Sequence, residues 1–112
     1  LPTGVAVDPL GHIYVADAGN NCIRKLADGL VTTFAGTTRG GFADGPAASA
    51  EFCHPMDVVG DSKGGLYVAD SSNNCVRKIA AGRVTTLAGL GPYDGGTPPA
   101  AGQAFAAPCA VA

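Results

Sequence analysis

The stretch IYVADAGNNCIRKLADGLVTTFAG, residues 13–36, decides the fold because it returns as LYVADSSNNCVRKIAAGRVTTLAG at residues 66–89. The offset between the two copies is 53 residues, and at this offset residues 2–36 and 55–89 are identical at 20 of 35 positions. Self-similarity at a fixed period is the signature of a repeat protein. We therefore interpret the chain as a tandem duplication of one structural unit.

Each repeat consists of four short apolar runs separated by turn signals, which is the pattern of an all-β unit. Asp28-Gly29, between the last two runs of the first repeat, is among the strongest short-range signals for a β-hairpin. No stretch shows helical periodicity. The sequence predicts strands over 4–8, 13–16, 22–26 and 31–35, and their equivalents around Val58 and over 66–69, 75–79 and 84–88.

The strands of one unit differ in polarity. The first strand is small and apolar, which suits a crowded position near the centre of a radial assembly. The third strand carries Arg24-Lys25 or Arg77-Lys78, which suits an outer, wetter position. This gradient is typical of a β-propeller blade. We predict an all-β fold of two four-stranded antiparallel blades, covering residues 1–54 and 55–107, with residues 108–112 starting the first strand of a third blade.

The pattern P-x-G-V-A-V-D, G-x-I-Y-V-A-D, N-x-x-I-R-K and G-x-V-T-T-x-A-G, found in residues 2–36, resembles the NHL repeat. Residues 55–89 repeat it in part, with Pro55, Val58 and Asp61 matching its first element. This resemblance implies blades of the kind that close into six-bladed propellers. Two blades and a fragment cannot close such a ring, and a blade cannot bury its faces alone. We therefore expect the chain to be part of a larger or oligomeric propeller, such as a homotrimer, or of an open, fibrous array.

Composition and charge argue against several classes of partner. The 112 residues include 7 Lys and Arg against 9 Asp and Glu, giving a net charge of −2, so we predict no nucleic-acid partner. No apolar run approaches membrane-span length, so we predict no membrane insertion. His12 and His54 fall on opposite rims of the predicted blades, and we predict neither a metal nor another cofactor.

The four cysteines are predicted to join neighbouring blades through disulfide bonds. The loop between the second and third strands should lie on the same rim as the entry into the next unit. This topology favours disulfides Cys22–Cys53 and Cys75–Cys109 over the other pairings. Such bridges imply a secreted or extracellular protein, the cell surface included. Free buried thiols are the main alternative, and a zinc site is disfavoured because no C-x2-C pair is present.

The two long loops, residues 37–54 and 90–107, are the predicted contact surface, because loops on a rigid scaffold carry binding. Phe52 and the equivalent Phe105 are expected in the core. Asp17 and Asp70 are predicted to have structural roles, with Arg24 and Arg77 as their ion partners. The candidate binding residues are Phe42, Asp44, Tyr93 and Asp94.

The sequence thus predicts a non-catalytic extracellular scaffold or protein-interaction module that self-assembles into a ring or a filament. Its partners would be proteins, including further blades of its own kind, with glycans as a second class. No G-x-S-x-G motif supports a serine nucleophile. The alternative is a propeller enzyme of the lyase or hydrolase type, whose site at the ring centre would have to use Asp8, Asp57 and Asp61.

Overall fold

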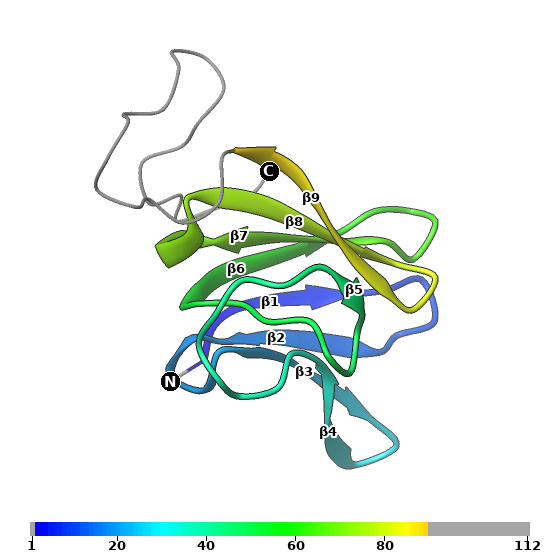
Figure 1. The fold of residues 1–112 in the computed structure, drawn as a ribbon. Helices are drawn as coiled ribbons and strands as arrows, with labels where there is room; N and C mark the ends of the chain where they lie inside the picture. The colour runs from blue at the N-terminus through cyan, green and yellow to red at the C-terminus, as the bar shows by residue number, and fades with distance from the viewer. Residues whose placement is uncertain (1, 90–112) are drawn as a thin grey trace, which may run out of the picture.

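The computed structural model describes residues 2–89, which form two antiparallel β-sheets stacked on each other (Figure 1). Strand order in the first sheet is β1-β2-β3-β4, and in the second it is β5-β9-β8-β7-β6. The predicted all-β fold with four-stranded antiparallel units is confirmed. The first sheet consists of β1 (Pro2–Val7), β2 (Ile13–Asp17), β3 (Cys22–Ala27) and β4 (Leu30–Ala35), and the second of β5 (Gly45–Pro46), β6 (Pro55–Gly60), β7 (Leu66–Asp70), β8 (Cys75–Ala80) and β9 (Arg83–Gly89).

The turns follow the backbone preferences of their residues. Asp28 and Gly29 both have positive φ, 54° and 76°, and Ala81 and Gly82 repeat this geometry at 52° and 73°. Two successive positive φ angles are characteristic of the type I′ hairpin, so the predicted hairpin is confirmed. The loops after β2 and β7 each contain one turn of 3-10 helix, η1 (Ala18–Asn20) and η2 (Ser71–Asn73), which the sequence did not predict.

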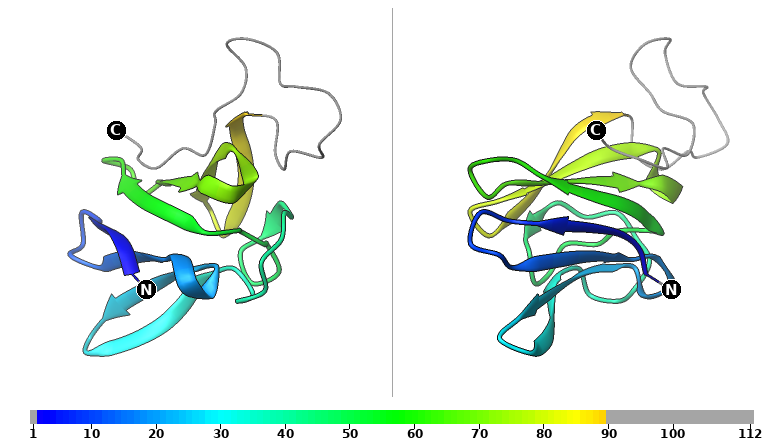
Figure 2. Two further views of the ribbon diagram at one scale, coloured as in Figure 1. Left: turned by 90° about the vertical axis from the view of Figure 1, so that its left-hand side faces the viewer. Right: turned by 180° about the vertical axis from the view of Figure 1, so that it is seen from behind.

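The first strands of the two repeats, β1 and β6, approach each other closely (Figure 2). A Cβ atom on Gly4 would lie 2.7 Å from the Cα of Asp57, so only glycine fits at this position. The Thr3 hydroxyl donates a hydrogen bond to the Pro55 carbonyl across the same junction, at 3.3 Å. The two strands therefore meet backbone to backbone, as expected of the strands nearest the centre of a radial assembly.

The hydrophobic core lies between the two sheets. Each sheet contributes residues from one face only, the face that is turned toward the other sheet. Phe52, in the linker between the sheets, is fully buried in the same cluster, which confirms its predicted core position. The buried cluster is Ala6, Tyr14, Ala16, Ile23, Ala35, Ala50, Phe52, Val58, Leu66, Val68, Ile79 and Val84.

The linker over residues 36–54 is bound to the second sheet. Its short strand β5 pairs with β9, although these residues fall in the range predicted for the first blade. The Ala47 amide donates to the Gly82 carbonyl at 2.9 Å, and the Gly36 amide donates to the Ala47 carbonyl at 3.0 Å. The linker thus closes the outer edge of the second sheet. No helix within residues 2–89 is long and apolar enough to cross a membrane.

Candidate functional site

A fully buried guanidinium lies on the core face of the second sheet. Arg77, on β8, donates from Nη1 to Asp70 Oδ2 at 2.6 Å and to the Glu51 carbonyl at 2.9 Å. Its Nη2 donates to the Ala43 carbonyl at 2.7 Å and to Asp44 Oδ1 at 2.9 Å. The prediction that the third strand is exposed to solvent was wrong for Arg77. The linker supplies all of these acceptor atoms except that of Asp70, and it excludes water from the guanidinium.

Two aromatic rings complete the surroundings of Arg77. The guanidinium carbon lies 4.7 Å from the centroid of Phe42 and 5.0 Å from that of Phe52, within the range of a cation–π contact. Every one of these contacts except Asp70 comes from the linker. We call the linker residues that contact Arg77 the linker clamp; its members are Phe42, Ala43, Asp44, Glu51 and Phe52.

Asp70 is the buried counterion of Arg77, which confirms the predicted ion pair. Its carboxylate also accepts hydrogen bonds from Asn73 Nδ2 and from the Cys53 amide, both at 2.8 Å. Burial raises the pKa of the Asp70 carboxyl, and these donors together with the guanidinium oppose that rise. Asp70 thus ties the linker end at Cys53 to the second sheet, in addition to neutralising Arg77.

The equivalent arginine of the first sheet, Arg24, has a different environment. Its Nε donates to Asp17 Oδ2 at 3.0 Å and its Nη1 to the Thr33 hydroxyl, and its side chain is 28% exposed. The Asn20 side chain, and then Arg24, hold the pKa of Asp17 below its usual value, and this second predicted ion pair is also confirmed. Within residues 2–89, no linker clamp covers Arg24.

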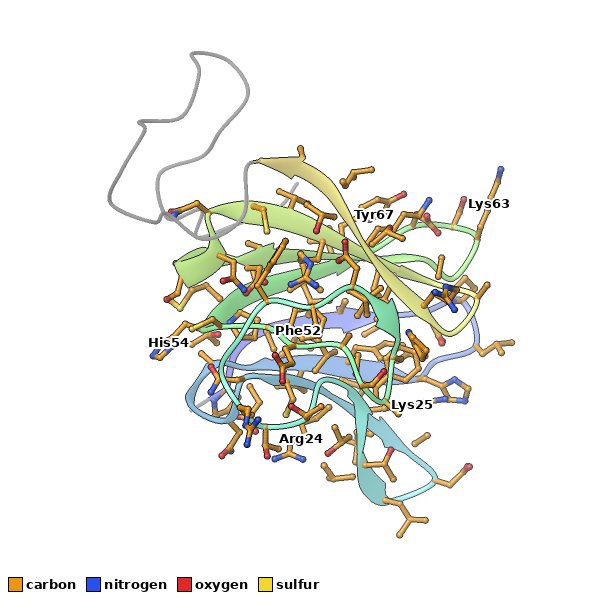
Figure 3. The ribbon with its side chains drawn as sticks, viewed as in Figure 1. Arg24, Lys25, Phe52, His54, Lys63 and Tyr67 are labelled. Carbon is orange, nitrogen blue, oxygen red and sulfur yellow. The ribbon has the colours of Figure 1, made fainter. Side chains whose placement is uncertain are left out.

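Strand register shows that Arg24 and Arg77 belong to equivalent faces. In the first sheet, Val5 pairs with Val15, Val15 with Arg24, and Arg24 with Thr33, so these side chains share one face. Figure 3 shows Arg24 on the side of the first sheet that faces away from the second sheet. We call this the outer face of the first sheet; its residues are Val5, Val7, Ile13, Val15, Arg24, Leu26, Val31 and Thr33.

The outer face of the first sheet is apolar and exposed, whereas its repeat-equivalent in the second sheet is buried. Val5 is 63% exposed and its equivalent Val58 is 0% exposed. Val31 is 67% exposed and its equivalent Val84 is 0% exposed. Both members of each pair are valine, so the difference in exposure arises from what packs on the two faces. The first sheet and the linker lie over the second sheet, and nothing in residues 2–89 lies over the outer face of the first. Contiguous exposed apolar surface of this kind marks interaction sites.

The predicted binding residues lie partly in the linker clamp. Phe42 is 39% exposed beside Arg77, and Asp44 also accepts a hydrogen bond from the Thr86 hydroxyl at 3.0 Å. Tyr93 and Asp94, like Phe105, lie outside the described residues. A partner-binding role for these four residues stays a prediction, and the structure gives Phe42 and Asp44 a role in holding the linker on the second sheet.

The carboxylates considered for catalysis are engaged in local turns. Asp61 accepts hydrogen bonds from the amides of Gly65 and Lys63, both at 2.8 Å, and from the Tyr67 hydroxyl at 3.1 Å. The two amides hold the pKa of Asp61 below its usual value. Asp8 makes the equivalent contacts in the first sheet, with His12 added at 3.1 Å. Among residues 2–89, no three His, Cys, Asp or Glu side chains are grouped as metal ligands.

Two of the described cysteines, Cys22 and Cys53, belong to segments that meet where the linker enters the second sheet. The His54 amide donates to Asn21 Oδ1 at 3.0 Å, so the residues adjacent to these two cysteines are in contact. Cys22, Cys53 and Cys75 are free thiols in this structure, and burial raises the pKa of Cys22 and that of Cys75, the latter to about 12. Cys109 lies outside the described residues, and both predicted bridges stay predictions.

Truncating the two equivalent arginines should have unequal effects on stability. Arg77→Ala leaves the buried Asp70 carboxylate without its counterion, and we expect it to cost about 3–5 kcal/mol in the free energy of unfolding. Arg24→Ala removes a partly exposed pair and should cost about 0–1 kcal/mol. Urea unfolding of the two variants and the parent measures both costs. Equal losses would contradict the assignment of Arg77 as the residue that anchors the linker.

Comparison with known proteins places this architecture in a family. The family model of the NHL repeat matches residues 1–26 and 52–79. The chain is 38% identical over 80 residues to Protein SUPPRESSOR OF QUENCHING 1, chloroplastic, of Arabidopsis thaliana, covering 70% of this chain and 8% of that protein. It is 34% identical over 105 residues to the human NHL repeat-containing protein 2, covering 80% of this chain and 14% of that protein.

A solved structure shares the fold. A structural genomics protein of unknown function from Bacteroides thetaiotaomicron superimposes with a TM-score of 0.73 at 23% identity, covering 89% of this chain and 26% of that one. The chain therefore spans about a quarter of this structure and a still smaller part of the two curated relatives. The repeat pattern, the two antiparallel sheets of four and five strands and the matches to residues 1–26 and 52–79 together show that the chain belongs to the NHL repeat family.

Proposed function

We propose that this chain is a non-catalytic protein-interaction and scaffold module that works by packing its blades against further blades of the same kind. NHL repeats are generally protein-interaction modules, which is the starting point of the proposal. The observation that carries it is the exposed, apolar outer face of the first sheet. At the equivalent positions of the second sheet, the apolar residues Val58, Leu66, Val68, Ile79 and Val84 are buried. Because this face is part of the hydrophobic core in the second repeat, the same face of the first repeat is suited to be buried by another blade.

The free energy available from this face is substantial. Four of its apolar side chains, Val5, Val7, Leu26 and Val31, are exposed by 36% or more. Burying one such side chain completely contributes about 1.5–3 kcal/mol. Association itself costs about 4–15 kcal/mol. Because the four side chains are already partly buried, they supply only part of this cost, and the wider blade contact must supply the remainder. Contacts of this head-to-tail kind give a ring when the rotation closes and a filament when it does not.

The non-catalytic part of the proposal is supported by the local roles of the carboxylates. Asp8 and Asp61 accept hydrogen bonds from the amides and tyrosine hydroxyls of their own turns. Asp57 lies against Gly4 at the junction of β1 and β6, and its Oδ1 accepts from the Val58 amide at 3.0 Å. A general acid or base needs access to a substrate proton, and these three side chains are placed to fix backbone instead.

An extracellular setting is the second part of the proposal, and it depends on the cysteines. We expect Cys22 and Cys53 to form a bridge in an oxidising compartment, because Asn21 and His54 hold their segments together on one rim. Mass spectrometry of the secreted protein, digested without reductant, tests this directly. A peptide pair joined through Cys22 and Cys53 is the expected result. Alkylation of both as thiols would remove the support for an extracellular setting and leave the assembly proposal intact.

The assembly proposal predicts concentration-dependent association through the outer face of the first sheet. In sedimentation velocity runs, the parent chain should form species larger than a monomer as its concentration rises. Val5→Asp combined with Val31→Asp should weaken association by about 100-fold, because each unpaired carboxylate buried at the contact costs about 1–3 kcal/mol.

Leu10→Asp is the matched control for this experiment. Leu10 is 82% exposed but lies in the turn after β1, off the outer face, so the variant should associate like the parent. Circular dichroism should show the same sheet content in all three proteins. A parent chain that stays monomeric at every concentration, or a double variant that associates normally, would contradict the proposal.

A further inference from the structure

Two tight turns from different repeats enclose a cleft at one end of the molecule. The turns follow β1 and β6, and these strands stay side by side to their ends, since a Cβ atom on Gly60 would lie 3.8 Å from the Val7 carbonyl oxygen. Both turns lie at the same end of the molecule (Figure 1). We call the space between them the turn cleft; it has a volume of about 280 Å³ and is lined by Asp8, Pro9, Leu10, Ser62, Lys63 and Gly64.

Each turn is held in place by the carboxylate of its first residue. Asp8 Oδ1 accepts hydrogen bonds from the amides of Leu10 and His12, both at 2.9 Å, and Asp8 Oδ2 accepts one from the Tyr14 hydroxyl at 3.0 Å. Asp61 accepts the equivalent three bonds in the second turn. These carboxylates are therefore occupied by their own turns, and the cleft is formed before a ligand arrives, which lowers the entropic cost of binding.

The two walls of the turn cleft have different chemistry although the turns are repeat-equivalent. One wall consists of Pro9 and Leu10, and the equivalent residues of the other wall are Ser62 and Lys63. These are the central positions of the two turns, where most residue types are compatible with the backbone. Leu10 is 82% exposed, and Lys63 is also exposed. The turn cleft thus combines an apolar wall with a polar, cationic wall that the fold itself does not require.

The same change from an apolar to a cationic residue recurs at the neighbouring hairpins. Leu30, at the start of β4, is 67% exposed, and its repeat-equivalent is Arg83, an exposed residue at the start of β9. An isolated exposed leucine needs no explanation. Here two exposed leucines of the first repeat are both replaced by cations in the second repeat, at the same end of the molecule. This end is therefore apolar over the first repeat and basic over the second.

The ammonium group of Lys63 has no counterion among the described residues. The ion pairs within residues 2–89 involve His12, Arg24 and Arg77, and none of them involves Lys63. The carboxylate of the same turn, Asp61, is occupied by backbone amides. Lys63 extends outward from its turn (Figure 3). Its charge is therefore available to an acidic group of a partner.

We propose that the turn cleft binds a segment of a partner protein in which an apolar side chain lies next to a carboxylate. The apolar side chain lies against Pro9 and Leu10, and the carboxylate lies on the Lys63 ammonium with the Ser62 hydroxyl as a further donor. The volume of about 280 Å³ is just below the range of about 300–1,000 Å³ typical of small-molecule sites, which favours one or two protein side chains as the occupant.

This site rests on the protein-interaction role proposed above but not on self-assembly. None of the residues that line the turn cleft belongs to the outer face of the first sheet. The site therefore stays accessible whether or not another blade covers that face, and the two proposals can be tested separately.

Titration with a capped tetrapeptide, acetyl-Ala-Leu-Glu-Ala-amide, tests the site by nuclear magnetic resonance of the isotope-labelled chain. The amide signals of Leu10 and Lys63 should shift as the peptide is added, because these residues line the turn cleft. Replacing the peptide's Glu by Gln, or its Leu by Ala, should each weaken binding by about 3-fold or more, because each change removes one of the two contacts.

Three variants of the chain locate the contacts. Lys63→Glu should weaken binding of this peptide by about 5-fold or more and should bind the peptide that has Lys in place of Glu, because the charges are exchanged. Leu10→Asp should also weaken binding of the Leu-Glu peptide. Arg39→Glu is the matched control, because it makes the same charge change at an exposed linker residue outside the turn cleft, and it should bind like the parent.

Unshifted Leu10 and Lys63 signals, or normal binding of the peptide by Lys63→Glu, would overturn the site. Equal losses of binding in Lys63→Glu and Arg39→Glu would also overturn it, because they would indicate a general effect of net charge. The Val5 and Val31 double variant should bind the peptide like the parent. A chain that binds the peptide but never associates would keep this site and remove self-assembly, and the opposite result would remove only this site.

Discussion

The buried guanidinium of Arg77 requires an oxygen acceptor for each N–H group that is removed from water. Its own strand neighbour, Asp70, supplies one, and the linker supplies the others through Asp44 and the carbonyls of Ala43 and Glu51. The path of the linker is therefore fixed by a side chain of the next blade. Because the linker also brings Phe52 into the core, one polar centre and one apolar anchor hold the two blades in a single arrangement.

Two closely related repeats, identical at 20 of 35 aligned positions, experience different environments in this chain. The second blade has cover on the face that holds Arg77, and its equivalent side chains are buried there. The first blade presents the same residue types to solvent, with Arg24 satisfied only in part by Asp17 and Thr33. In a repeat protein, stability comes from the interfaces between neighbouring units as much as from the units themselves. The unequal burial of equal residues is therefore the basis for proposing that a further unit packs on this surface.

Much of the fold could be predicted from the sequence, because period, apolar runs and turn residues are local signals. The strand positions, the Asp28-Gly29 hairpin and the Asp17 and Asp70 ion pairs were found in this way. The burial of Arg77 could not be predicted from its charge, which favours an exposed position. Arg77 pairs with Val68 and Thr86 and alternates with Lys78, so its position already assigned it to an apolar face.

The linker was the other feature that local signals could not reveal. Its short strand β5 and its clamp form only where a blade distant in sequence supplies β9 and Arg77, so their energetics are tertiary. Phe42 and Asp44 were recognised as special residues, but their contacts depend on that distant partner. Conversely, the exposed outer face emerges only when exposures in the structure are compared between repeat-equivalent positions such as Val31 and Val84.

A crystal structure of the associated protein would test the central claim most directly, because it would show what covers Val5, Val31 and Arg24. We expect the second blade of a neighbouring copy against this face, in the same relative orientation that the two blades have within one chain. Two outer faces packed against each other about a two-fold axis, or Arg24 left in solvent in a stable assembly, would contradict it.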